Sequence, residues 1–83
     1  MKEIVWTKKA LRQLRKIKSR EDQRTIYAAV TALEEFPSCD NVKKIKTTDM
    51  YRLRAGRWRV IFTESLEVIT IEEVKRRNER TYR

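Results

Sequence analysis

The stretch Tyr51–Phe62, YRLRAGRWRVIF, alternates apolar and basic residues on both sides of Gly56, the only glycine of the chain. An alternation with a period of two is typical of a β-strand that buries one face. Glycine at a tight turn supplies the positive φ that a hairpin requires. The stretch therefore predicts two antiparallel strands joined at Gly56, with Leu53, Trp58 and Val60 toward a core.

The same alternation collects basic side chains on the face opposite that core. A loop of two or four residues around Ala55 and Gly56 would set Arg54 opposite Arg57 and Arg52 opposite Arg59, whereas a loop of three would break this pairing. Like charges directly opposite on a sheet destabilise it by roughly 0.2–1 kcal/mol per pair. Folding alone does not select this arrangement, which indicates a face that binds an anion; the alternative is a solvated charged surface.

The chain before this hairpin predicts a strand and two helices. Glu3–Trp6 is short, β-branched and aromatic, as strands are. Apolar residues then recur at helical spacing over Lys8–Lys18, after Thr7 as N-cap. Ser19 begins a second helix, which we expect to end at Phe36 because Pro37 follows.

The remainder of the chain predicts strands. Asn41–Lys46 is expected as a short edge strand whose lysines discourage edge pairing. Leu66–Val74 is expected as the last strand, after a turn at Thr63–Ser65. The predicted fold is α+β, with two N-terminal helices packed on an antiparallel sheet in the order β-α-α-β-β-β-β, as one domain over residues 1–83.

Composition limits the classes of function. The chain of 83 residues carries 21 Lys and Arg against 12 acids, a formal charge of +9, which favours nucleic acid, an anionic membrane surface or an acidic protein as partner. One cysteine and no histidine exclude a Cys–His pair and a zinc site, so no metal and no cofactor are expected. We expect a cytoplasmic protein without a membrane partner, because no signal peptide and no apolar run of membrane length are seen.

The arginines and the C-terminal residues together suggest a site for RNA. Arginine presents a planar fork of donors that matches a phosphate and stays charged. Five further cations lie in the last nine residues and could close one end of the face: Lys75, Arg76, Arg77, Arg80 and Arg83. Without histidine, Tyr82 is the main candidate for a general base, since the surrounding cations favour its ionised form. A packing role for Tyr82 is the alternative.

Two stretches, YRLRAGRWRVIF and VITIEEVKRRNERTYR, on a chain of this length that opens with strand–helix–helix, resemble the RelE/ParE superfamily of toxins from bacterial type II toxin–antitoxin systems. The resemblance covers essentially the whole chain. It implies a small α+β fold with a concave basic face. It also implies a cognate antitoxin that wraps and neutralises the toxin, with a heterotetramer as one arrangement of the complex.

In the RelE-like branch, the resemblance implies a metal-independent endoribonuclease that cuts mRNA in the ribosomal A site. The matching catalytic positions are Arg52, Arg54, Arg59, Arg76 and Tyr82, with Lys75 or Arg77 as alternatives to Arg76. The further RNA-binding positions are Lys75, Arg77, Arg80 and Arg57. Some nuclease members carry lysine at the first two positions, and arginine in effect cannot pass a proton. We therefore expect an electrostatic role for Arg52 and Arg54, with a C-terminal lysine or water protonating the leaving group.

Two other functions remain open for a chain with this resemblance. ParE-like members inhibit DNA gyrase by binding and need no nuclease residues. An inactive member would bind only its antitoxin. The set of matching positions favours the RelE-like nuclease.

Overall fold

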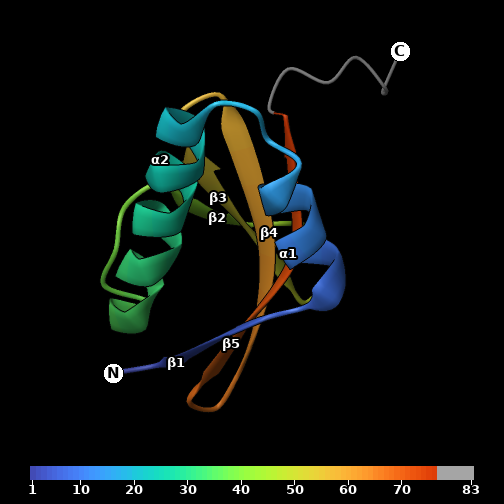
Figure 1. Cartoon of the computed structure of the whole chain (residues 1–83). Helices are drawn as coiled ribbons and strands as arrows, with labels where there is room; N and C mark the ends of the chain where they lie inside the picture. Colours follow the sequence, from blue (N-terminus) through green and yellow to red (C-terminus); the bar gives the residue numbers. More distant parts are fainter. Residues whose placement is uncertain (77–83) are drawn as a thin grey trace.

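The computed structural model describes residues 1–76 and confirms the predicted order of helices and strands (Figure 1). The elements are β1 (Glu3–Trp6), α1 (Lys8–Arg15), α2 (Arg20–Thr31), the 3₁₀-helix η1 (Ala32–Glu35), β2 (Val42–Lys44), β3 (Met50–Ala55), β4 (Trp58–Ser65) and β5 (Val68–Arg76).

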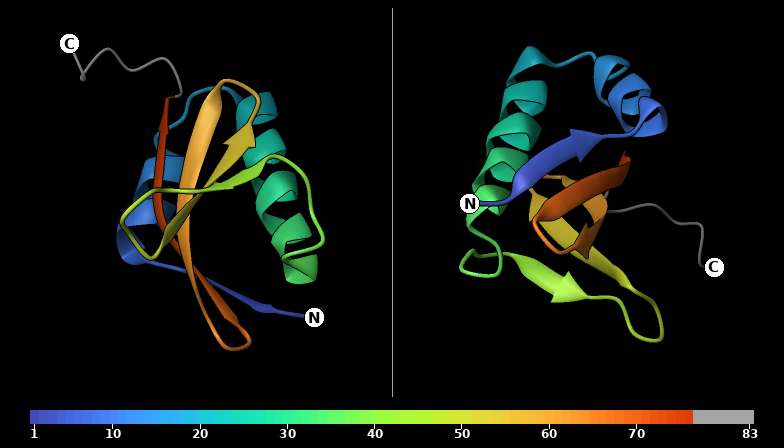
Figure 2. Two further views of the ribbon diagram at one scale, coloured as in Figure 1. Left: turned by 180° about the vertical axis from the view of Figure 1, so that it is seen from behind. Right: turned by 90° about the horizontal axis from the view of Figure 1, so that it is seen from below.

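The strands form one five-stranded sheet in the order β1-β5-β4-β3-β2. From β2 to β5 the strands are an antiparallel meander, as predicted. The sheet is mixed, however, because β1 runs parallel to β5. Both helices lie on one side of the sheet, with α1 beside β5 and α2 across β3 and β4 (Figure 2). The other side of β2–β4 carries no helix from the part of the chain that the structure describes.

Both helices begin at the predicted caps. The hydroxyl oxygen of Thr7 accepts a hydrogen bond from the backbone N–H of Ala10, and that of Ser19 accepts one from Asp22. Such bonds satisfy N–H groups that have no partner inside the helix.

The helices end earlier than predicted. α1 stops at Arg15 rather than Lys18, because Ile17 turns into the core and the Gln23 amide donates to the carbonyls of Leu14 and Ile17. The α-helical geometry of α2 stops at Thr31, and a 3₁₀ turn continues the chain to Glu35.

The predicted register of the hairpin was wrong by two residues. Ala55 pairs with Trp58, so the two residues of the turn are Gly56 and Arg57, and Gly56 has the positive φ of 62°. Arg54 therefore stands opposite Arg59 instead of Arg57. A shift by two residues keeps Arg52, Arg54 and Arg59 on their common face and changes their pairing partners, whereas Arg57 leaves the strand for the turn.

The same register corrects the predicted neighbours of Arg52 and the position of the next turn. Arg52 stands opposite Ile61, not Arg59. The predicted turn at Thr63–Ser65 lies inside β4, where Ser65 pairs with Val68. The chain reverses at the next two positions, where Leu66 adopts a φ of 56°.

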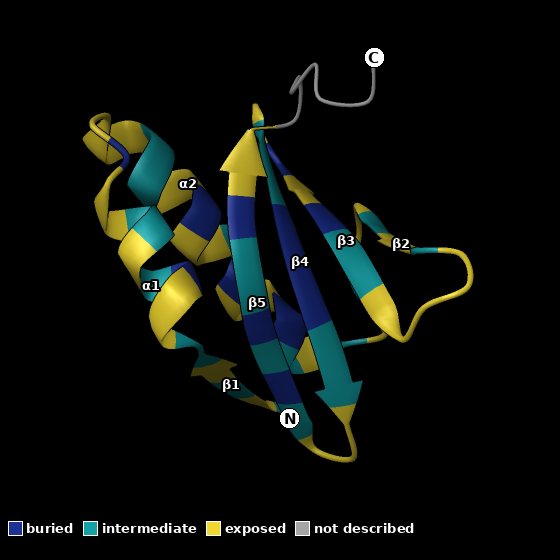
Figure 3. Ribbon diagram, turned by 90° about the vertical axis from the view of Figure 1, so that its right-hand side faces the viewer, coloured by how far each residue is buried: buried dark blue, intermediate teal, exposed yellow. Residues whose placement is uncertain are grey.

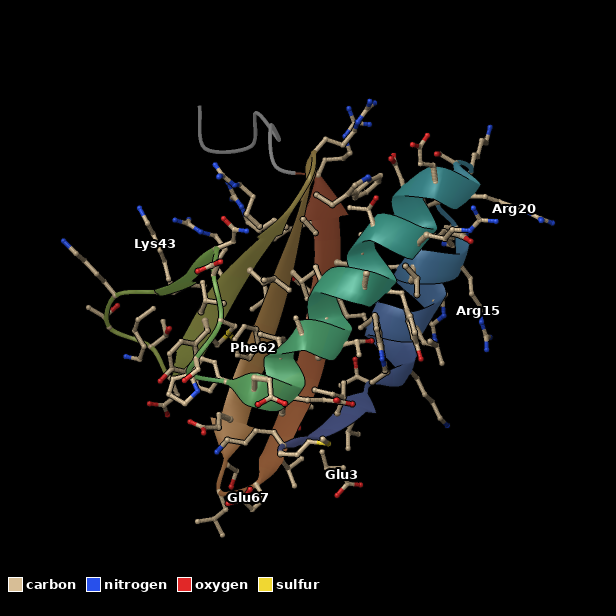
Figure 4. All side chains as sticks on the ribbon, turned by 90° about the vertical axis from the view of Figure 1, so that its left-hand side faces the viewer. Glu3, Arg15, Arg20, Lys43, Phe62 and Glu67 are labelled. Atoms are coloured by element: carbon tan, nitrogen blue, oxygen red, sulfur yellow. The ribbon has the colours of Figure 1, made fainter. Side chains whose placement is uncertain are left out.

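The core lies between the sheet and the two helices. Buried residues of β4 and β5 form much of its sheet side (Figure 3). Phe62 is fully buried, and its side chain lies between β4 and α2 (Figure 4). Its ring stacks on Tyr51 and meets Phe36 edge to face at a centroid distance of 5.5 Å. Ile61 is also buried but lies outside this cluster, on the other face of the sheet.

A hydrogen bond joins the tip of the hairpin to the first turn of α2. The indole N–H of Trp58 donates to Oδ2 of Asp22 at 3.0 Å. Nε of Arg57 lies 4.0 Å from the same oxygen, and the guanidinium of Arg76 lies 5.4 Å from the centroid of the Trp58 ring. Asp22 thus anchors the residue that immediately precedes Arg59.

We expect Asp22→Ala to lower the free energy of unfolding by about 1–2 kcal/mol, because a half-buried, charge-assisted hydrogen bond is lost. A double-mutant cycle with Trp58→Phe, measured by urea denaturation, should give a coupling energy of at least about 0.5 kcal/mol. Glu21→Ala is the matched control, since it also removes a carboxylate from the first turn of α2. An equal effect of the two alanine variants would contradict the anchoring role.

Candidate functional site

The face of the sheet opposite the helices carries two cross-strand rows of side chains. In the first row, Arg54, Arg59 and Lys75 stand side by side on β3, β4 and β5. In the second row, Lys43 of β2 pairs with Arg52 of β3. These five residues are called the basic face. Neighbouring strands lie about 4.8 Å apart, so the cations of a row repel one another at short range.

A hollow of about 450 Å³ opens on the basic face. It is lined by Asn41, Val42, Lys43, Arg52, Arg54 and Arg59. The side chain of Lys43 extends from β2 away from the helices, toward the open side of the sheet (Figure 4). A concave surface with guanidinium forks from two strands suits an anion that can accept several hydrogen bonds at once, such as a phosphodiester.

Two predicted members of the site lie elsewhere. Arg57 is part of the turn, and its guanidinium approaches Asp22 on the helix side. Arg76 pairs with Trp58, whose ring it covers, so it also lies on the helix side. The structure therefore does not place either arginine beside Arg59, whereas Lys75, which the sequence offered as an alternative to Arg76, pairs with Arg59.

A β-bulge explains why Lys75 and not Arg76 faces the site. Ile61 pairs with Glu73 and Phe62 with Ile71, so β5 has one extra residue between them. Such an insertion interrupts the alternation of faces along the strand. Ile71 consequently lies in the core on one side of the bulge, and Lys75 lies on the basic face on the other.

Glu73 links the basic face to α1. Its carboxylate accepts a hydrogen bond of 2.7 Å from Nζ of Lys9 and lies 3.2 Å from Nζ of Lys75. The hydrogen bond from Lys9 is the main cause that lowers the pKa of Glu73, and the charge of Lys75 adds to it. The carboxylate thus stays ionised and holds Lys75 beside Arg59.

Three predicted site residues, Arg77, Arg80 and Tyr82, lie outside the described residues. The sequence prediction missed Lys43, although alternation within Val42–Lys44 already placed Lys43 on the opposite face from Val42.

Within residues 1–76, no three Cys, Asp or Glu side chains are grouped so that they could hold a metal ion. None of the helices that the structure describes is long and apolar enough to cross a membrane.

We expect Glu73→Gln to reduce stability at pH 7 by roughly 0.2–1 kcal/mol, the usual range for partly exposed ion pairs. Because the folded pKa lies below the ordinary value of 4.5, the carboxylate contributes its stability above that value and loses it as the pH falls through the folded pKa. Urea denaturation of both proteins at pH 7 and at low pH measures the difference. A gap that persists in acid would contradict the ion-pair explanation.

The model of the family described as ParE toxin of type II toxin–antitoxin system, parDE, matches residues 4–81. No curated protein sequence matches the chain.

Among solved structures, the chain is similar to RelE in the archaeal RelE–RelB complex from Pyrococcus horikoshii OT3, with a TM-score of 0.80 and 26% identity over 94% of this chain and 97% of that chain. It is also similar to a chain of the chromosomal ParDE system from P. aeruginosa, with a TM-score of 0.78 and 18% identity over 92% of this chain and 96% of the other. The isolated E. coli RelE toxin has a TM-score of 0.75 and 18% identity over 99% of this chain and 92% of that chain.

The two structures below 25% identity support the fold alone, whereas the family model covers nearly the whole chain. The fold and the family model both indicate a toxin of a type II toxin–antitoxin system. The chain belongs to the ParE toxin family of type II toxin–antitoxin systems, within the RelE/ParE superfamily.

Proposed function

We propose that this toxin is a metal-independent endoribonuclease that cuts mRNA in the ribosomal A site and so blocks translation. The observation that carries the proposal is the cross-strand row of Arg54, Arg59 and Lys75 beside the hollow. Repulsion within such a row works against folding, and a bound phosphodiester relieves it. A phosphodiester is also the group on which an endoribonuclease acts.

In the proposed reaction, the 2′-hydroxyl of the RNA attacks its own adjacent phosphate. The new bond joins the 2′-oxygen to phosphorus, and the bond from phosphorus to the 5′-oxygen breaks. One proton leaves the 2′-hydroxyl and one reaches the departing 5′-oxygen, so the products are a cyclic phosphate and a free hydroxyl. The enzyme must align these groups, stabilise the additional charge on phosphorus and move both protons.

The residues of the basic face divide these tasks. Arg52 and Arg54 line the hollow and hold the phosphate backbone in place. Arg59 lies between Arg54 and Lys75 in its row, where its charge stabilises the phosphorane. Arginine keeps its proton, so the proton transfers fall to other groups.

We assign protonation of the 5′-oxygen to Lys75 and deprotonation of the 2′-hydroxyl to Tyr82. Lysine can release a proton, and Lys75 stands directly opposite Arg59. The role of Tyr82 rests on the family pattern. Arg77 and Arg80 are assigned to RNA binding on the same ground, while Arg76 supports Trp58 rather than the phosphate.

The proposed function requires both protein and RNA partners. The P. horikoshii relative is seen in complex with RelB. By analogy, a cognate antitoxin neutralises this toxin, and a heterotetramer of toxin and antitoxin is the expected assembly. The working partners are the ribosome and its mRNA in the cytoplasm.

A second candidate is inhibition of DNA gyrase by binding alone. The family model that matches this chain describes ParE toxins, and this observation favours the second candidate. Under it, the basic face would contact gyrase or its DNA without chemistry.

The two candidates are separated by brief induction in a bacterial host, followed by primer extension on transcripts and an assay of DNA damage signalling. We expect codon-phased cuts, reduced about 10²–10³-fold in Arg59→Gln, because the charge that stabilises the transition state is removed. Arg24→Gln, which removes an exposed charge on α2, is the control. Intact transcripts together with DNA damage signalling would instead establish the gyrase inhibitor.

The assignment of Lys75 is tested by Lys75→Arg, which keeps the charge but cannot supply a proton. We expect cleavage to fall by about 10²–10⁴, as for loss of a general acid, while ribosome binding is retained. Lys44→Arg is the matched control on β2. Cleavage by Lys75→Arg at the rate of the original toxin would leave Lys75 with a purely electrostatic role.

A further inference from the structure

α1 carries a second cationic surface that the proposed cleavage does not use. Every exposed residue from position 8 to position 18 is Lys or Arg. These residues, called the α1 stripe, are Lys8, Lys9, Arg12, Arg15, Lys16 and Lys18. The exposed positions of α2 are mixed in charge and include Glu21, Thr25 and Tyr27, so the stripe is not a general property of the helices.

The charges of the α1 stripe work against the helix that bears them. Lys8, Lys9, Arg15 and Lys16 each lie three or four positions from Arg12, and like charges at these spacings destabilise a helix by roughly 0.2–0.5 kcal/mol per pair. The first turn contains Lys8 and Lys9 and no acid, although its dipole favours negative charge. Among residues 1–76, Lys9 is the one member of the stripe with a carboxylate within 4 Å.

Other contacts hold α1 in place. The Oε1 atom of Gln13 accepts a hydrogen bond of 2.7 Å from the backbone N–H of Val74, and Ala10 is fully buried. Thr7 caps the start of α1, and Gln23 binds the carbonyls at its end. A helix of eight residues is too short to be stable alone. These contacts therefore stabilise α1 and offset the repulsion between its cations.

The α1 stripe meets the basic face at the edge of β5. Lys9 of the stripe and Lys75 of the basic face both bind Glu73. Beyond this junction the two surfaces diverge, since Arg15 and Lys43 lie on opposite sides of the molecule (Figure 4). An anion that contacts both surfaces must therefore be large and must curve around the edge of the sheet.

The composition of the α1 stripe favours a nucleic acid over a protein or a membrane as the large anionic partner. Protein interfaces are anchored by buried aromatic or aliphatic side chains, and helices that bind membranes insert an apolar face. α1 offers neither, because its exposed residues are all cations while Ala10 and Leu14 pack against the core. Phosphate contacts to a nucleic acid require cations alone.

We propose that the α1 stripe binds the phosphate backbone of folded RNA, at a site separate from the hollow where cleavage is proposed. The stripe supplies affinity without sequence specificity and holds the toxin on a structured RNA while the basic face contacts the single strand. The binding itself does not depend on the proposed nuclease chemistry.

The test uses the purified full chain and a fluorescent RNA hairpin with 2′-O-methyl riboses, which cannot be cut by attack of a 2′-hydroxyl. Binding is measured by anisotropy over a range of salt concentrations. The variant Arg12→Gln/Arg15→Gln/Lys16→Gln keeps good helix-forming residues. The control Arg24→Gln/Lys44→Gln/Lys46→Gln removes three exposed charges outside the stripe, so the two variants have the same net charge.

We expect the stripe variant to bind at least about tenfold more weakly, with a salt slope smaller by about 2–3, because each lost phosphate contact lowers the slope by roughly 0.9. The control variant should change the slope by less than about 1. Circular dichroism confirms that both variants fold.

Equal slopes for the folded stripe and control variants would overturn the proposal. So would unchanged RNA binding by a stripe variant that loses affinity for its antitoxin, since the cations would then serve an acidic protein. The variant Arg54→Gln/Arg59→Gln tests the basic face in parallel. A reduced slope in the stripe variant combined with intact transcripts after induction would support the RNA site and reject the nuclease.

Discussion

The pairing of β3 with β4 is the constraint on which the rest of the structure depends. Two residues, Gly56 and Arg57, reverse the chain, and the register that follows places Leu53 and Val60 against the helices. The same register directs Arg54 and Arg59 to the opposite side. A slip of one residue would exchange the two faces and bury the arginines, so the apolar core and the basic face are specified together.

The basic face has a cost for folding that the core must offset. Three cations stand in one row, and the whole chain has a formal charge of +9. On the other side, Phe62 and the fully buried aliphatic residues supply the hydrophobic stabilisation. Ile61 is buried on the basic face itself, between Arg52 of β3 and Glu73 of β5. Binding of an anion to this face adds stability to the folded state.

The edge of β5 connects the two cationic surfaces. β1 pairs with the first half of β5, and beyond it Gln13 of α1 binds the backbone N–H of Val74, so the strand edge is covered. Lys9 reaches Glu73 from the same helix. The contacts that protect this edge also place the α1 stripe next to the end of the row formed by Arg54, Arg59 and Lys75.

Local patterns were sufficient to predict much of the fold and part of the candidate site. The caps Thr7 and Ser19, strand Glu3–Trp6 and the order of elements follow from short-range sequence signals. The common face of Arg52, Arg54 and Arg59 follows from the alternation of side chains. These features could be predicted because each depends on residues close together in the chain.

The sequence by itself therefore determined which residues alternate and where the helices start. Only the tertiary structure decided which residues are neighbours across the sheet. The parallel pairing of β1 with β5 joins the two ends of the described chain. The hairpin register moved Arg57 into the turn, and the bulge in β5 placed Lys75 rather than Arg76 beside Arg59. A period of two specifies a face but no partner, and an inserted residue reverses the faces beyond it, so hydrogen bonding between distant strands had to make these choices.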